Sequence, residues 1–191
     1  MSSNGAKQDR GEESYRRYLD GDESAFEELV ELYFEELILF ANGYVRDMHA
    51  SEEIALDSML ELMIHHGRYS FRSSLKTYLF AVARHKAIDR VRKHSRERTV
   101  PIDEATGIGE DTLTREVFRN EVKRRVLGAV DELPPDQRAA VYLVYIEGMS
   151  YEEAGNVLKK SRKQMDNLLT KAKRRLRDIL GEEGAELIKE E

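Results

Sequence analysis

The fold is decided by residues 150–176, which read SYEEAGNVLKKSRKQMDNLLTKAKRRL. A serine followed three residues later by Glu or Gln occurs twice in this stretch, at Ser150 and again at Ser161. This is the spacing of a capping box, in which two side chains satisfy unpaired backbone N–H groups at the start of a helix. The boxes predict a short helix over 151–159 and a longer one over 162–180. Two capped helices joined by a tight turn are typical of a helix-turn-helix.

The longer helix has two unlike faces. The apolar face comprises Met165, Leu168, Leu169, Ala172, Leu176 and Ile179. On the other face, Arg162 or Lys163 could pair with a guanine edge and Asn167 with an adenine. Lys171 and Arg174 suit phosphates, which give affinity without sequence information. A solvated basic helix on an ordinary bundle is the alternative, but the capped helix pair favours DNA binding.

Charge is unevenly distributed along the chain, whose net charge is −6 at pH 7. Residues 1–64 sum to −11, whereas residues 84–98 sum to +5 and residues 159–177 to +8. The distribution of charge matters more for binding a polyanion than the total does. The two basic blocks therefore predict two separate surfaces that face a polyanion.

Composition excludes several classes of protein. The chain has no cysteine, so neither a disulfide framework nor a thiolate metal site is possible. No apolar run approaches the roughly 20 residues that span a bilayer. The polar N-terminus lacks the apolar core of a secretion signal. We therefore expect a cytoplasmic protein without membrane insertion.

The N-terminal part predicts two helices in succession. Apolar residues recur at helical spacing from Phe26 to Val45, which indicates a long amphipathic helix. This helix is predicted to begin at an N-cap on Ser24 and to end near Arg46. The next helix, over 51–64, is predicted to start at an N-cap on Ser51.

The helix over 51–64 has more apolar surface than one partner can cover. One apolar stripe is Ala55, Ser58, Met59 and Leu62, and a second is Leu56, Leu60 and Met63. An acidic stripe of Glu53, Asp57 and Glu61 lies between them. One apolar stripe can pack on the preceding helix, but the other needs a second partner, inside the domain or outside it.

These patterns predict an all-α protein with two small helical domains. Pro101, Gly107 and Gly109 lie in a stretch without periodicity, which is typical of a flexible linker. Further helices are expected at 75–93, 113–131 and 135–147. The expected organisation is a disordered tail over 1–14, a first domain over 15–96, the linker over 97–112, a second domain over 113–181 and an acidic tail over 182–191.

Five short motifs follow one another along the chain. They are 22–29 (DESAFEEL), 71–79 (FRSSLKTYL), 83–89 (ARHKAID), 133–138 (LPPDQR) and 145–153 (YIEGMSYEE). As an ordered set they resemble regions 2 and 4 of bacterial extracytoplasmic-function sigma factors, in the sigma-70 superfamily. The resemblance implies a transcription initiation factor that binds core RNA polymerase and directs it to promoters.

The resemblance also implies roles for individual residues. The helix over 51–64 corresponds to the surface that docks on the clamp helices of the largest polymerase subunit, with contacts from Glu53, Leu56, Asp57, Leu60, Glu61 and Met63. The loop over 65–74 and the following helix correspond to the part that recognises and opens the −10 element, through Arg68, Tyr69, Phe71, Arg72, Arg84, His85 and Arg90. The last helix corresponds to the reader of the −35 element, through Ser161, Arg162, Lys163, Gln164, Asp166, Asn167, Thr170, Lys171 and Arg174.

The implied partners are core RNA polymerase, through its clamp helices and flap, promoter DNA and a possible anti-sigma factor. The chain is expected to be a monomer when free. Tyr69 and Phe71 could stack on or line a pocket for an unstacked base, which strand opening requires. Alternatively, both rings fill the domain core, and this alternative is favoured for Phe71.

The chain departs from the family pattern at several positions. The family usually has Gln at the position of Leu56 and a large aromatic residue at that of Met63. It usually has Gly where this chain has Lys159, and a non-Gly residue at positive φ costs roughly 1–2 kcal/mol. We therefore expect the turn to differ. Residues 163–167 also differ from the common recognition sequence, so promoter preference does not carry over.

Two other classes of protein compete with this interpretation. An enzyme could use the five histidines, but the sequence has no His-Glu-x-x-His, no Glu-x-x-His pair and no glycine-rich phosphate loop. No catalysis, metal or cofactor is therefore expected. A helix-turn-helix regulator that is not a polymerase subunit would bind duplex DNA alone, as a dimer on paired half-sites.

Overall fold

The structure, a computed structural model, describes residues 3–97, 126 and 128–187, and within these ranges every regular element is helical. In chain order the elements are α1 (Ser3–Leu19), α2 (Ser24–Val45), α3 (Met48–Ile64), the 3-10 turn η1 (His66–Arg68), α4 (Leu75–Glu97), α7 (Pro135–Val141), the π-helical turn η2 (Tyr142–Ile146), α8 (Tyr151–Leu158) and α9 (Arg162–Leu187). The predicted all-α class is confirmed. The predicted linker beyond residue 97 and most of the predicted helix over 113–131 lie outside the described residues.

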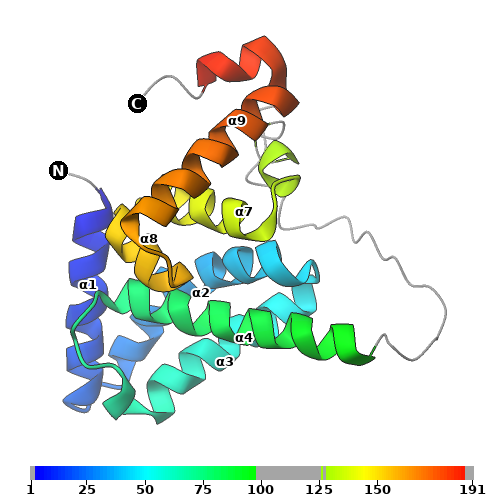
Figure 1. Cartoon of the computed structure of the whole chain (residues 1–191). Helices are drawn as coiled ribbons and strands as arrows, with labels where there is room; N and C mark the ends of the chain where they lie inside the picture. Colours follow the sequence, from blue (N-terminus) through cyan, green and yellow to red (C-terminus); the bar gives the residue numbers. More distant parts are fainter. Residues whose placement is uncertain (1–2, 98–125, 127, 188–191) are drawn as a thin grey trace.

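Helices α1 to α4 form a bundle in the N-terminal half (Figure 1). Helix α2 contacts α1, α3 and α4, so its apolar residues occupy the centre of the bundle. Leu29, Tyr33, Leu37 and Phe40 of α2 are buried there, together with Phe80 of α4. Their spacing of three and four residues places them on one face of α2, as the helical periodicity predicted.

Two predicted helix caps are wrong. The hydroxyl of Ser24 donates to Asp22 at 2.6 Å and does not cap α2. Helix α3 begins earlier than predicted because Asp47 is its N-cap and accepts a hydrogen bond from the N–H of Ala50 at 2.9 Å. Ser51 is instead buried in the first turn, where its hydroxyl donates to the carbonyl of Asp47. The carboxylate of Asp47, four residues upstream, therefore takes the place of Ser51 as the cap.

The N-terminal helix α1 differs from the disordered tail predicted over 1–14, since it is helical from Ser3. Its last turns attach it to the bundle. The Ser14 hydroxyl donates to Glu28 at 2.6 Å, and Tyr15 is fully buried. Burial raises the pKa of Tyr15 to about 12. One buried ring at the end of a polar segment is a weak sequence signal, which is why the helix was not predicted.

The C-terminal half contains both predicted capping boxes. The N–H of Glu153 donates to the Ser150 hydroxyl at 3.2 Å, and the N–H of Ser150 donates to the Glu153 carboxylate at 2.9 Å. The N–H of Ser161 donates to Gln164 at 2.8 Å, and the reciprocal bond measures 3.3 Å. The two helices of the predicted helix-turn-helix are therefore α8 and α9. The single helix predicted over 135–147 is divided into α7 and η2.

The turn between α8 and α9 keeps the left-handed residue that glycine usually supplies. Lys159 has φ 54° and ψ 46°. The expectation that a lysine in place of glycine would alter the turn is therefore wrong at this residue. A Cβ added to the nearby Gly155 of α8 would lie 2.6 Å from the carbonyl oxygen of Lys160. The backbone of the turn passes so close to α8 that position 155 requires glycine.

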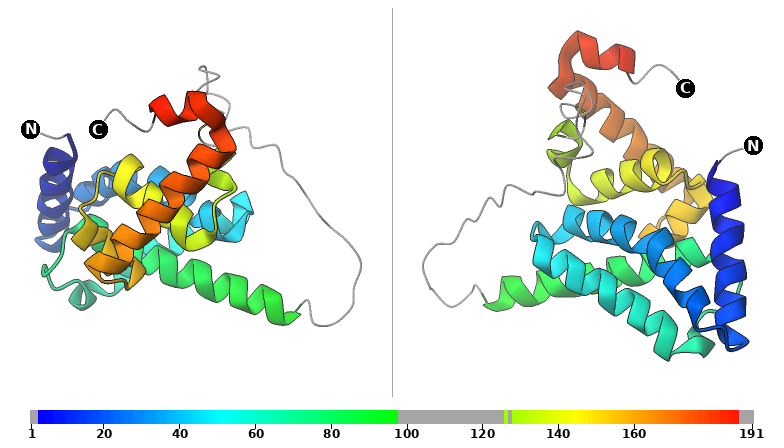
Figure 2. Two further views of the ribbon diagram at one scale, coloured as in Figure 1. Left: turned by 45° about the horizontal axis from the view of Figure 1, so that its top comes forward. Right: turned by 180° about the vertical axis from the view of Figure 1, so that it is seen from behind.

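The C-terminal half lies against the N-terminal bundle (Figure 2). Helix α8 packs on α4, and α7 contacts α2. Helix α9 packs on α7 and α8. The two halves are thus in direct contact through α4 and α8, although these helices are far apart in the sequence.

Candidate functional site

The outer face of α3 carries the first group of predicted site residues. The stripe formed by Ala55, Ser58, Met59 and Leu62 is buried in the bundle. Leu56 is 52% exposed, and Leu60 and Met63 are partly exposed. We call these last three residues the α3 apolar stripe. The predicted surplus of apolar surface on this helix is confirmed.

The acidic stripe of α3 is partly paired within the bundle. Glu53 accepts a hydrogen bond from Arg90 at 2.8 Å. Glu61 lies 3.0 Å from the ammonium of Lys86 and 2.5 Å from the guanidinium of Arg68. Hydrogen bonds from Lys86 and Arg68 lower the pKa of Glu61, so this carboxyl stays ionised at neutral pH. Two of the three predicted acids, and the predicted DNA contacts Arg68 and Arg90, therefore already have partners in the chain.

The two aromatic side chains of the loop over 65–74 differ in their exposure to solvent. Tyr69 is 4% exposed, and its hydroxyl donates to the carbonyl of Ser73 at 2.8 Å. Burial raises the pKa of Tyr69. Phe71 is 39% exposed and has φ 56°, an uncommon backbone conformation for a bulky residue. The core position favoured for Phe71 is therefore wrong, and Tyr69 fills the core instead.

Arg16 of α1 lies beside the exposed ring of Phe71. Its guanidinium carbon is 5.1 Å from the ring centroid. The rings of Tyr15 and Tyr69 lie 6.0 Å and 4.6 Å from the same ring and support it from within the bundle. A supported ring next to a guanidinium is a suitable platform for stacking an unpaired base. Sequence reasoning missed Arg16 because no spacing relates residue 16 to residue 71.

The remaining predicted −10 contacts lie in different environments. Arg72, in the loop, is exposed, and so is His85 of α4, whose Nδ1 is 3.3 Å from Asp89. Arg84 differs from both, since its side chain is only 14% exposed. It faces Asp136 of α7, with 4.0 Å between the guanidinium and the carboxylate. The structure therefore does not bring Arg84 together with the exposed residues of this group.

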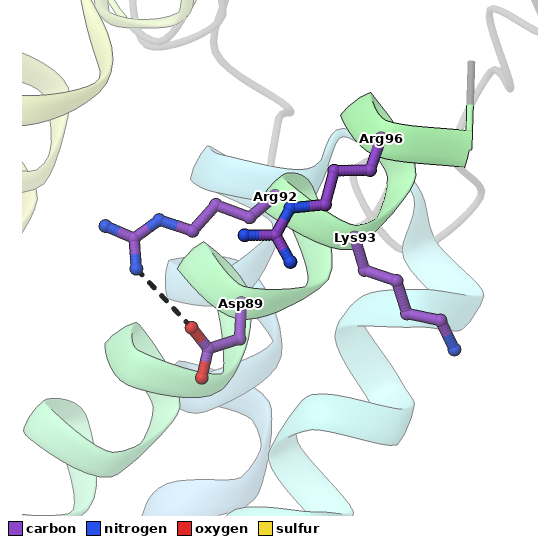
Figure 3. Close-up of a pocket in the computed structure, with 4 residues that line it drawn as sticks. All are labelled: Asp89, Arg92, Lys93 and Arg96. Atoms are coloured by element: carbon purple, nitrogen blue, oxygen red, sulfur yellow. Dashed lines mark ion pairs between the residues drawn. The ribbon is translucent and has the colours of Figure 1, made fainter. Parts of the chain in front are cut away.

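The last turns of α4 form a basic cluster. The sequence indicated this cluster only through the net charge of +5 over residues 84–98. Figure 3 shows Asp89, Arg92, Lys93 and Arg96 around an open pocket on the helix. Arg92 lies 3.7 Å from Asp89. Three cations exceed the single acid, so this surface suits a phosphate backbone.

The polar side of α9 is open to solvent. All nine residues predicted to contact DNA are exposed: Ser161, Arg162, Lys163, Gln164, Asp166, Asn167, Thr170, Lys171 and Arg174. Met165, Leu169, Ala172 and Leu176 are buried on the opposite side. The side-chain oxygens of Ser161 and Gln164 are engaged in the helix cap. The structure therefore leaves all nine predicted residues accessible, and seven of them have side chains that the cap does not use.

Two family models match the chain. The Sigma-70 region 2 model matches residues 29–97, and the Sigma-70, region 4 model matches residues 123–176; together they cover more than half of the chain. The ECF RNA polymerase sigma factor SigM of Bacillus subtilis is 28% identical over 153 residues, which are 80% of this chain and 93% of SigM. The RNA polymerase sigma factor CarQ of Myxococcus xanthus is 29% identical over 171 residues, which are 87% of this chain and 95% of CarQ.

Solved structures show the same fold. The sigma factor RpoE of Bartonella quintana, in complex with the anti-sigma factor NepR, has a TM-score of 0.66 at 22% identity, covering 81% of this chain and 96% of RpoE. CnrH, in complex with the cytosolic domain of CnrY, has a TM-score of 0.63 at 19% identity, covering 92% of this chain and 97% of CnrH.

The chain therefore belongs to the sigma-70 family of transcription factors. Within this family it is an extracytoplasmic-function sigma factor, a class of initiation factors that direct RNA polymerase. Over the described ranges, no helix is long and apolar enough to cross a membrane. In the same part of the chain, no three His, Asp or Glu side chains are placed to hold a metal ion.

Proposed function

We propose that this chain docks on core RNA polymerase through the α3 apolar stripe and places it on promoters by reading a −10 and a −35 element. The observation that carries the proposal is the exposure of Leu56 beside Leu60 and Met63, in a helix whose other apolar stripe is buried. Apolar surface left open on a folded domain indicates a protein partner. The family resemblance makes that partner the polymerase clamp helices.

The −10 element is assigned to the loop over 65–74 and to α4. Phe71 and Arg16 form the stacking platform for a base unpaired during promoter opening. Arg72 and the basic end of α4 hold the phosphate backbone on either side. Arg68 and Arg90 contribute after exchanging Glu61 and Glu53 for phosphate oxygens.

The −35 element is assigned to α9 in the major groove. Recognition helices meet base edges with their first turns, which here present Arg162, Lys163, Asp166 and Asn167. Lys171, one turn further on, and the basic residues after it hold the backbone. The two basic blocks of the sequence thus serve two separated parts of one promoter.

The partners follow from this assignment. The clamp helices of core polymerase contact the α3 apolar stripe, and the flap of the polymerase contacts the C-terminal half. The free chain is a monomer in the cytoplasm. An anti-sigma factor is a further candidate partner, since the sigma factor RpoE was solved in complex with the anti-sigma factor NepR.

A binding experiment with purified core polymerase tests the proposal. The chain is expected to co-purify with core enzyme in a one-to-one ratio. Failure to bind core, combined with tight binding of the free chain to duplex half-sites as a dimer, would instead establish the regulator interpretation.

A further inference from the structure

The middle of α1 is seated tightly on α2. The hydroxyl of Ser14 donates to Glu28 of α2 at 2.6 Å, and Ser14 is itself only 3% exposed. One turn earlier, a Cβ added to Gly11 would overlap the ring and hydroxyl of Tyr33, so only glycine permits this approach of the two helices. The backbone that carries Arg16, on the next turn of α1, is therefore held in place by packing.

Arg16 lies over the ring that the loop over 65–74 exposes. Its guanidinium carbon is 5.1 Å from the centroid of the Phe71 ring, and 64% of the Arg16 side chain is exposed. Phe71 has φ 56°, a strained conformation for a bulky residue, and strain of this kind is concentrated at functional sites. A base that stacks on Phe71 must therefore share the face of the ring with Arg16.

A carboxylate lies next to Arg16. Glu12, one turn earlier on α1, is 4.0 Å from the Arg16 guanidinium and accepts a hydrogen bond from the Tyr69 hydroxyl at 3.3 Å. Because a carboxylate repels phosphate groups, this pair is poorly suited to holding the backbone of a DNA strand. A neutral base edge is a better ligand for Arg16, since it brings no negative charge close to Glu12.

The donors of a guanidinium distinguish among the four bases. A guanidinium has five N–H donors in a planar fork and no acceptor. An unpaired base offers its Watson–Crick and Hoogsteen edges. Cytosine has adjacent acceptors at O2 and N3, and guanine has adjacent acceptors at O6 and N7, whereas the acceptors of adenine and thymine on these edges lie next to a donor. A fork of donors can therefore make two hydrogen bonds to cytosine or guanine but only one to adenine or thymine.

We infer that Arg16 selects the base that stacks on Phe71 during promoter opening, and that this base has two adjacent acceptors, as cytosine and guanine do. The inference rests on the proposed function and names the chemistry of its −10 site. When the base stacks, the exposed guanidinium moves from the face of the ring to the edge of the base, and Glu12 keeps it close. Arg16 then determines specificity, whereas Phe71 supplies stacking, which tolerates every base.

A promoter library randomised over the −10 element tests this role in transcription by core polymerase with the chain. The wild type should favour cytosine or guanine at least fivefold at one −10 position. Arg16→Ala should abolish the preference at that position alone, whereas Phe71→Leu should weaken initiation for all four bases alike. Arg10→Ala, at another exposed position of α1, is the control and should keep the preference.

Three results of the library experiment would overturn the inference. In the first, Arg16→Ala keeps every −10 preference of the wild type. In the second, the same variant loses initiation equally for all four bases, as loss of a phosphate contact would cause. In the third, the preference that it loses is one for adenine or thymine.

Base analogues test the contact at single atoms. Synthetic promoters with a mismatched, already open −10 element can carry 3-deazacytosine, which lacks N3, or 7-deazaguanine, which lacks N7, in place of the selected base. The analogue should reduce initiation by the wild type at least fivefold and should not affect Arg16→Ala, whose donors are already missing. An equal reduction with both chains would overturn the inference. A wild-type chain that does not initiate with core enzyme, or that has no −10 preference at all, would count against the proposed function itself.

Discussion

Arg90 of α4 donates a 2.8 Å hydrogen bond to Glu53 of α3, which joins a candidate DNA contact to a candidate polymerase contact. The two side chains are about half exposed. An exposed ion pair of this kind contributes about 0–1 kcal/mol to stability. Each residue can therefore change partners at little cost when polymerase and promoter bind.

Replacement of Arg90 by alanine should weaken promoter binding and leave the stability of the fold almost unchanged. We expect the free energy of unfolding to fall by less than about 1 kcal/mol. Binding of the polymerase complex to promoters should weaken, and its salt dependence should fall by about one unit of slope, since one phosphate contact is lost. Chemical denaturation and promoter binding at several salt concentrations measure the two effects. Arg10→Ala, at an exposed position of α1, is the control and should change neither.

The α3 apolar stripe should be required for polymerase binding. Leu60→Glu combined with Met63→Glu introduces two charges where an apolar partner is expected, and co-purification with core polymerase should be lost. Both side chains are partly exposed, so far-UV circular dichroism should remain that of the wild type. Leu19→Glu, at an apolar position of α1 with 39% exposure, is the control. Equal recovery of core enzyme with the double variant would rule out this surface.

The candidate recognition helix α9 should contain two groups of residues whose replacement by alanine has different effects on promoter binding. Arg162→Ala or Asn167→Ala should cost about 1–3 kcal/mol and relax the preference at one base position. Lys171→Ala or Arg174→Ala should weaken all promoters alike, because phosphates carry no sequence information. Initiation by the polymerase complex on a promoter library distinguishes the two groups. If neither of the first two variants shifts a base preference, α9 only clamps the backbone and specificity lies in the loop over 65–74.

The turn of the helix-turn-helix should be intolerant of a side chain at Gly155. A Cβ there would lie 2.6 Å from the carbonyl of Lys160, and backbone cannot move aside as a flexible side chain can. Gly155→Ala should destabilise the C-terminal half by about 1–3 kcal/mol through overpacking. Gly128→Ala is the matched control, since nothing lies within 4 Å of the added atom. Thermal unfolding followed by circular dichroism measures both, and equal midpoints would show that the turn relaxes freely.

Local patterns predicted much of the fold and of the candidate site. Helical spacing placed the buried and the exposed apolar stripes of α3 correctly, because each side chain's direction follows from its position on the helix. The capping boxes at Ser150 and Ser161 were equally local and are present as predicted. The Asp47 cap was missed because Ser51 has the same capping chemistry four residues later.

Contacts between distant residues could not be predicted in this way. Tyr69 and Phe71 are chemically similar neighbours in an aperiodic loop, so spacing does not tell which ring is buried and which is exposed. Lys76 and Glu147 form a buried ion pair although they are 71 positions apart, and no periodicity relates them. Contacts of this kind set the surroundings of Phe71 and the packing of the C-terminal half on the bundle.

The central claim is that this chain directs core RNA polymerase to promoters. The most direct measurement is transcription of fragmented bacterial DNA by purified core enzyme, with and without the chain, followed by mapping of the 5′ ends. New start sites are expected only when both core enzyme and the chain are present, each preceded by a shared pair of elements near −35 and −10. An unchanged set of start sites, with the chain bound to duplex DNA in the absence of polymerase, would contradict the central claim.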